Sequence, residues 1–184
     1  MSVTINGNGT ITGYDPVPNG SITSAKLATG VGGKLLQYKT AKRVSPVETS
    51  SQSYSEVTSD LRITLTPTAS DTTIHIIAYI YCSNNNNATS FRIRRNTASD
   101  FSGTDTEVIQ PSDFAANEDG ICTVYTQSAH MMTFPVSAWE ISGNTTARTY
   151  SPFYRIGGGT TYINRLVGND YQGVSTMAVM EIAA

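Results

Sequence analysis

Residues Thr72–Cys82 read TTIHIIAYIYC, and this stretch decides the fold class. Every second residue from Ile74 to Ile80 is aliphatic, and His75 lies on the opposite face. A period of two is typical of a β-strand that buries one face. Ile and Tyr also favour the pleated conformation. The stretch therefore predicts a core strand, with His75 as a strand-face histidine that makes structural hydrogen bonds.

The same alternation recurs from Lys34 onward, and no later segment shows sustained helical periodicity. Turn residues such as Asn84–Asn87 and Gly157–Gly159 separate the apolar runs, and we interpret Gly157–Gly159 as a hairpin turn. The predicted strands are Leu35–Arg43, Glu56–Leu65, Thr73–Cys82, Ser90–Arg95, Thr106–Ile109, Ile121–Phe134, Ala138–Ile141, Ala147–Ile156, Thr161–Val167 and Ser175–Ala183. Many short strands with frequent turns predict an all-β antiparallel β-sandwich, of jelly-roll or similar type, over residues 34–184.

The first 33 residues differ from the rest, because they are glycine-rich and cannot build a core of their own. Residues 3–12, VTINGNGTIT, predict two short β segments around an Asn-Gly turn. The segment Ser21–Ala28 predicts a helical turn, and Thr29–Gly33 a flexible link. We therefore expect residues 1–33 to form an extended N-terminal arm and linker.

The last predicted strand, Ser175–Ala183, is apolar on both faces. Met177, Val179 and Glu181 share one face, whereas Ala178 and its alternate neighbours share the other. Burial on both sides indicates a sandwich centre or a subunit interface. A buried carboxylate needs a partner, because an unpaired buried charge is very costly.

Cationic side chains are the candidate partners for Glu181. Its carboxylate is expected to face Arg92, Arg94 or Lys42, or to lie at the sheet margin. In the run FRIRRN, alternation places Arg92 and Arg94 on one strand face and Arg95 on the other. Arginine forks can hold carboxylates across a subunit boundary, contact a ligand or stack on tyrosines. The alternative is a solvated strand face.

Low charge restricts the classes of partner. Charged residues make up 14% of the 184 residues and the net charge is −2, so no basic field attracts nucleic acid. A lightly charged surface rich in Thr, Tyr and Asn can be buried against copies of itself, which favours oligomerisation over a neutral monomeric sandwich. The N-terminus lacks a signal-peptide pattern, and no run approaches a membrane span, so we expect cytosolic synthesis without membrane insertion.

The sequence offers few candidate catalytic or metal-binding residues. His75 and His130 are the only histidines, and no metalloprotease, nucleophile-elbow or phosphate-binding motif occurs. The acidic stretch Asp100–Asp119 is expected to be a solvated loop rather than a cation or glycan-hydrolysis site. Cys82 and Cys122 are expected to be small core residues, with a disulfide formed after release from the cell as the alternative. We expect no enzyme activity, metal or cofactor.

The motif GSITSAKLA, from Gly20 to Ala28, resembles an element common in tail-fibre and other appendage proteins of tailed bacteriophages. TINGNGTITG before it, SFRIRRN, TYINRL and the ending STMAVMEIAA continue the likeness. The resemblance implies a homotrimeric virion structural protein with a jelly-roll or tumour-necrosis-factor-like C-terminal domain. It also implies that the N-terminal arm docks onto the particle. The implied docking residues are Ile5, Ile11, Tyr14, Ile22, Lys26 and Leu27.

Tail fibres usually carry long shaft repeats, and this sequence has none. The expected protein is therefore a compact capsid decoration, cement or head-fibre protein, and its expected partners are itself and other virion proteins. A short tail or neck fibre engaged in host adsorption is the first alternative. A soluble carbohydrate-binding module, without any virion, is the second, with an aromatic platform from Trp139 or from Tyr150 and Tyr154. A host-surface glycan is a further candidate partner of the virion protein. Trp139 itself is expected in the core.

Overall fold

The computed structural model describes residues 4–5, 11–12, 34–85, 87–108, 121–126, 130–166 and 172–184. The chain divides into two units, Met1–Gly33 and Lys34–Ala184. In the first unit, β1 (Thr4–Ile5) pairs antiparallel with β2 (Ile11–Thr12), so the strand pairing expected of the N-terminal hairpin is present. The helical turn predicted at Ser21–Ala28 lies outside the described residues.

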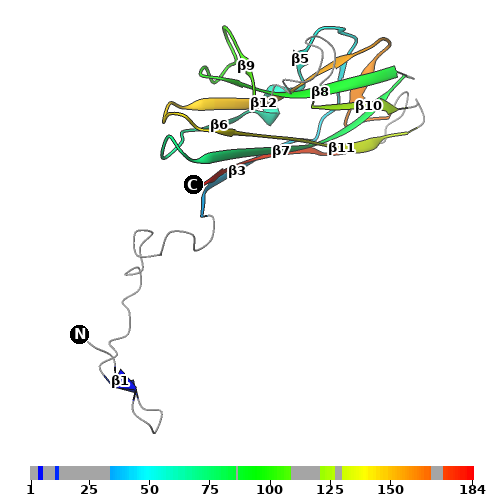
Figure 1. Ribbon diagram of the computed structural model, residues 1–184. Helices are drawn as coiled ribbons and strands as arrows, with labels where there is room; N and C mark the ends of the chain where they lie inside the picture. Colours follow the sequence, from blue (N-terminus) through cyan, green and yellow to red (C-terminus); the bar gives the residue numbers. More distant parts are fainter. Residues whose placement is uncertain are drawn as a thin grey trace. The chain divides into compact units, whose positions relative to one another are not determined.

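The second unit consists of two antiparallel sheets that face each other (Figure 1). One sheet, the β7 sheet, is built around its longest strand. β11 lies on one side of β7, while β14, followed by β3, and β13, followed by β4, lie on the other. Its strands are β3 (Leu35–Arg43), β4 (Val47–Thr49), β7 (Thr73–Asn84), β11 (Met132–Ile141), β13 (Thr161–Ile163) and β14 (Ser175–Ile182).

The second sheet, the β8 sheet, is centred on a pair of long neighbouring strands, β8 and β12. β10 and β9 pair with the free side of β8, and β5 and β6 pair with the free side of β12. Its strands are β5 (Ser55–Glu56), β6 (Ile63–Leu65), β8 (Asn87–Asn96), β9 (Thr106–Glu107), β10 (Cys122–Thr126) and β12 (Arg148–Ile156).

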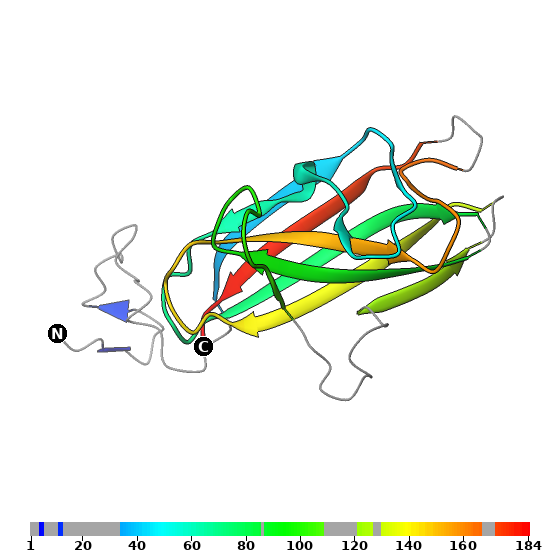
Figure 2. The ribbon, with the colours of Figure 1, turned by 90° about the horizontal axis from the view of Figure 1, so that it is seen from above.

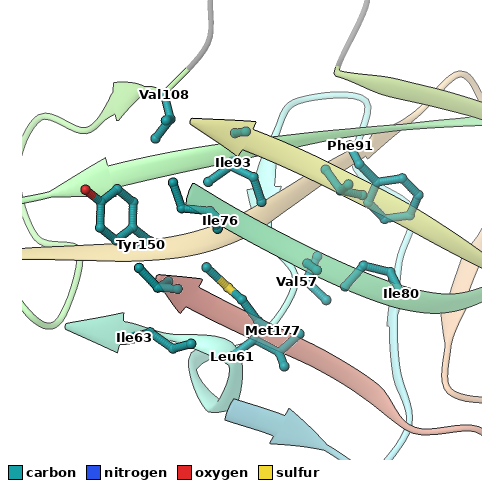
Figure 3. Close-up of a cluster of buried hydrophobic side chains, with 14 of the residues drawn as sticks. Val57, Leu61, Ile63, Ile76, Ile80, Phe91, Ile93, Val108, Tyr150 and Met177 are labelled. Atoms are coloured by element: carbon teal, nitrogen blue, oxygen red, sulfur yellow. The ribbon is translucent and has the colours of Figure 1, made fainter. Parts of the chain in front are cut away.

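The hydrophobic core lies between the two sheets, as Figure 3 shows for residues from both. The alternate residues Ile74, Ile76, Ala78 and Ile80 of β7 are fully buried, which is the face that the sequence pattern predicted. Burying a large aliphatic side chain contributes roughly 1.5–3 kcal/mol. Successive long strands along the chain alternate between the two sheets, as in a jelly roll: β7, β11 and β14 lie in one sheet and β8 and β12 in the other. The predicted all-β antiparallel sandwich is confirmed.

The predicted strand Glu56–Leu65 is wrong, because a helical turn interrupts it. A 3-10 helix, η2 (Ser59–Leu61), separates β5 from β6. The Thr58 hydroxyl accepts a hydrogen bond from the Asp60 backbone N–H at 3.3 Å, which caps this turn. Leu61 is fully buried. The turn therefore places an apolar residue in the core without strand geometry.

The boundaries around β11 also differ from the prediction. The predicted strand Ile121–Phe134 is two strands, β10 and the start of β11, which lie in different sheets. β11 then continues through Pro135, where a break was predicted. Proline cannot donate to a ladder, so it is tolerated on edge strands. Among the described residues, β11 pairs only with β7 and is such an edge.

Gly157–Gly159 is not the predicted hairpin turn, because it connects β12 of one sheet to β13 of the other. The Gly157 backbone N–H bonds to the Ala88 carbonyl at 3.0 Å. A Cβ on Gly157 would lie only 2.8 Å from the Asn87 side chain, and Gly159 has a φ of +77°. The positive φ favours glycine at Gly159, whereas a Cβ on Gly157 would require only the end of the Asn87 side chain to move. No helix among the described residues is long and apolar enough to cross a membrane.

Candidate interaction surface

The outer face of the β7 sheet, opposite the core, combines apolar and aromatic side chains with a few polar ones. Strand register aligns Trp139 of β11 with His75 of β7, His75 with Met180 of β14, and Met180 with Tyr38 of β3. Figure 2 shows these four strands side by side. Two further rows of aligned residues follow, one through Ile77 and one through Tyr79. We define the outer face as these three rows: Trp139, His75, Met180 and Tyr38; Ser137, Ile77, Ala178 and Thr40; and Pro135, Tyr79, Thr176 and Lys42.

A groove of about 710 Å³ runs over this face, lined among others by Tyr38, Ile77, Tyr79 and Ala178. Tyr38 is 59% exposed and Trp139 58% exposed. Large exposed apolar patches are typical of interaction sites, so this face is the candidate surface. Among the described residues, the outer-face side chains of β14 are only partly covered, although its sequence predicted burial on both faces.

Trp139 is exposed, and its predicted place in the core is wrong. Alternation along β11 places either Ala138 and Glu140 or Trp139 and Ile141 toward the core, and the second pair is the more apolar. Glu140 points inward instead, because the buried Arg148 guanidinium and the Tyr150 hydroxyl donate hydrogen bonds to it. Tyr150 and Tyr154 are buried, so they cannot form the glycan platform that was considered with Trp139.

Glu140 is the centre of a polar network between the two sheets. Its Oε1 accepts hydrogen bonds from Arg148 Nη1 at 3.1 Å and from the Tyr150 hydroxyl at 2.7 Å. Arg95 Nη1 lies 3.1 Å from its Oε2. The Arg148 side chain is only 4% exposed. Burial, followed by the Glu140 charge, raises the pKa of Tyr150 well above its ordinary value. Sequence reasoning missed Glu140 and Arg148.

The arginines of β8 lie on the faces that alternation predicted. Arg94 Nη1 bonds both carboxylate oxygens of Asp105 at 3.0 Å, and its guanidinium lies 5.1 Å from the centre of the Phe153 ring. Arg92 lies 4.1 Å from the centre of the Tyr54 ring, a cation–π distance. These arginines and Arg95 therefore have partners within the chain. Their contact with another subunit or a ligand stays a prediction.

Glu181 is fully buried at the end of β14, and its predicted arginine or lysine partners are wrong. Its Oε1 accepts from the Thr68 backbone N–H at 2.7 Å, and from the Thr68 and Thr72 hydroxyls at 2.8 Å. Gln37 Nε2 donates to Oε2 at 2.6 Å. Burial by itself raises the pKa of Glu181, but these hydrogen bonds together hold it below its ordinary value of 4.5. Neutral donors thus replace the expected cation.

The depressed pKa of Glu181 predicts a loss of stability in acid. The ionised carboxylate is bonded only in the folded state, so its contribution is fully present above the unfolded-state pKa and is lost as the pH falls through the lower folded-state pKa. In urea unfolding, the difference in free energy between the wild-type chain and Glu181→Gln is expected to be largest at pH 7 and to shrink below pH about 4.5. A difference that is constant from pH 7 to pH 3 would contradict this account.

The histidine and the two cysteines singled out in the sequence have structural roles. His75 Nε2 lies 3.1 Å from the Ser137 hydroxyl, so the expected structural hydrogen bond is present. Cys82 is a buried core residue as predicted, Cys122 packs against the core, and both thiols are free. Burial raises the pKa of both. Within the described residues, no three His, Cys, Asp or Glu side chains form a group that could hold a metal ion.

The predicted docking residues fall into two groups. Ile5 and Ile11 lie opposite each other in the β1–β2 pair. The remaining four lie outside the described residues, so the predicted docking role is untested for all six. These four are Tyr14, Ile22, Lys26 and Leu27.

Comparison of the structure with solved structures finds likeness at low sequence identity. Eiger TNF from S. frugiperda has 13% identity and a TM-score of 0.40, with 79% of this chain and 93% of that chain covered. A structure of the infectious bursal disease virus Gx strain has 11% identity and a TM-score of 0.35. The match covers 80% of this chain and 40% of the viral chain. No protein-family model matches the sequence, and no curated protein matches it.

Proposed function

We propose that this chain is a bacteriophage virion structural protein, namely a homotrimeric capsid decoration, cement or head-fibre protein. The outer face of the β7 sheet is the observation that carries the proposal, because it offers a wide apolar surface for assembly. The appendage motif between Gly20 and Ala28 supports the virion context. In this proposal the arm docks on the particle, and the sandwich forms the outward part.

A second copy of this chain is the occupant that best suits the outer face. Lys42 is its only formally charged residue, so the face has no charge pattern that selects a charged partner. The three rows of the outer face cover four strands over about six residues, which is roughly 400 Å² in projection. This is about half of the ~800 Å² that each partner of a standard interface buries, and the β11 edge described next adds to it. The low charge of the face, together with this added area, suits a subunit contact.

Closed ring symmetry requires two different patches on each subunit. The outer edge of β11 supplies the second patch, because Met132 and Ile141, which lie outside the defined outer face, are exposed there. In the proposed trimer, the groove of one subunit receives the β11 edge of the next. Pairing or covering that edge also protects an otherwise open sheet edge from non-specific association.

Removal of the arm tests the attachment. We expect residues 34–184 alone to form a folded trimer that no longer binds particles, because three arms per trimer multiply attachment through effective concentration. Recombinant full-length and truncated chains are added to particles that lack the protein, and occupancy is measured by mass spectrometry. Normal occupancy with the truncated chain would show that the arm is not the anchor.

The copy number per particle separates the two virion locations. A decoration or cement protein is expected at many copies and increases the resistance of particles to heat. A short tail or neck fibre, the alternative, is expected at few copies, and its loss impairs adsorption to cells. Quantitative mass spectrometry of purified particles measures this number directly. Absence from particles would overturn both virion assignments.

A further inference from the structure

A polar pocket of about 220 Å³ lies away from the outer face, where three segments of the sandwich meet. The end of β8, the β8–β9 turn with β9, and the β11–β12 loop supply its walls. We propose that this pocket binds an acidic monosaccharide unit, a sugar ring that carries a carboxylate. Its lining residues are Arg95, Asn96, Thr97, Thr104, Thr106, Asn144, Thr146 and Arg148.

Arg95 provides the carboxylate contact. Its Nη1 is the atom that pairs with Glu140, and its Nε and Nη2 make no hydrogen bond within the described part of the chain. A guanidinium offers two parallel N–H donors, which match a carboxylate. Two arginines and one glutamate form this network, so its formal charge is +1 and an anion is favoured. The Arg95 side chain is 35% exposed, so a ligand can reach it.

Hydroxyl groups supply the sugar contacts. The side chains of Thr97, Thr104, Thr106 and Thr146 are exposed around the pocket, and each hydroxyl can both donate and accept. None of the described residues that line the pocket is aromatic, so the proposed recognition rests on hydrogen bonds rather than on ring stacking. Its volume is below the roughly 300–1,000 Å³ of pockets that hold drug-sized ligands, which suits one ring.

The pocket is held in place before any ligand binds. Asn96 Nδ2 donates to the Ser102 carbonyl at 3.0 Å, and its Oδ1 accepts from the Ala98 N–H at 2.9 Å. Asn144 Oδ1 accepts from the Thr146 N–H at 2.9 Å and from Arg148 Nη2 at 2.8 Å. Such internal bonds lower the ordering cost of binding.

Binding of three small molecules to the full chain tests the proposal by NMR titration. D-Glucuronate carries both carboxylate and hydroxyls, glucose only hydroxyls, and acetate only the carboxylate. We expect glucuronate to shift the amide signals of residues around Thr104 and Thr146, and to bind roughly tenfold or more tightly than the other two. No shift with glucuronate, or equal affinity for acetate, would overturn the sugar-acid assignment.

Two variants place the ligand in this pocket. Arg95→Lys keeps the charge but loses the fork, and is expected to weaken glucuronate binding roughly tenfold. Thr104→Tyr fills the pocket from an exposed position and is expected to abolish binding. Arg165→Lys is the matched control, because Arg165 is 36% exposed and pairs with Glu48. Unchanged binding in both pocket variants would refute the site, whereas the control is expected to bind as the wild type does.

Discussion

Ala178→Arg is expected to convert the proposed trimer into monomers. Ala178 lines the groove of the outer face and points away from the core, so the substitution leaves the sandwich intact. A guanidinium at this position would be buried without a partner in every subunit contact, which costs several kcal/mol. Sedimentation of the wild-type chain should give three times the 19.7 kDa of one chain, and that of the variant a single chain mass.

Ala88→Arg is the matched control for this experiment. Ala88 is also half-buried and outward on a strand, but it lies on β8 of the opposite sheet. We expect this variant to sediment as the wild type does. A monomeric wild-type chain at micromolar concentration, or an Ala178→Arg variant that stays trimeric, would remove the outer face as the subunit contact.

Glu140→Ala is expected to destabilise the sandwich by about 3–5 kcal/mol. The substitution leaves the Arg148 guanidinium buried with its anionic partner removed and leaves the Tyr150 hydroxyl without its acceptor. Urea unfolding at a fixed chain concentration measures the change. Because subunit association also contributes to stability, both chains are compared at the same concentration.

Glu48→Ala is the control for the buried network. Glu48 bonds Arg165 at 2.7 Å, as closely as any bond of Glu140, but its side chain is 59% exposed. Solvent screens such a pair, so we expect a loss below about 1 kcal/mol. Equal losses in the two variants would show that burial does not make the Glu140 network important.

Alternation along single strands could be predicted from the sequence. Ile74 to Ile80 indicated the buried face of β7, and FRIRRN indicated which arginines share a face of β8. These inferences hold because the period of two is a local property of extended backbone. Sheet membership is not local, which is why Gly157–Gly159 was interpreted as a hairpin turn although it connects the two sheets.

A capped turn and a proline explain the remaining differences between the predicted and the observed strands. The capped 3-10 turn at Thr58 lies within an apolar pattern that a strand would also satisfy, so periodicity alone did not reveal it. The predicted strands left a gap at Pro135, which lacks a backbone donor, and its place on an edge strand is what makes it acceptable.

The sequence by itself determined the all-β class, the core faces of the long strands and the low charge that favours self-association. Only the tertiary structure decided which carboxylates are buried and which groups bond to them. Arg95 and Glu140 are separated by 45 residues, and Thr72 and Glu181 by 109. Alternation within one strand carries no information about such distant partners. A charge that looks exposed in sequence, such as Glu140, can therefore point inward, while Trp139 beside it lies on the open apolar face.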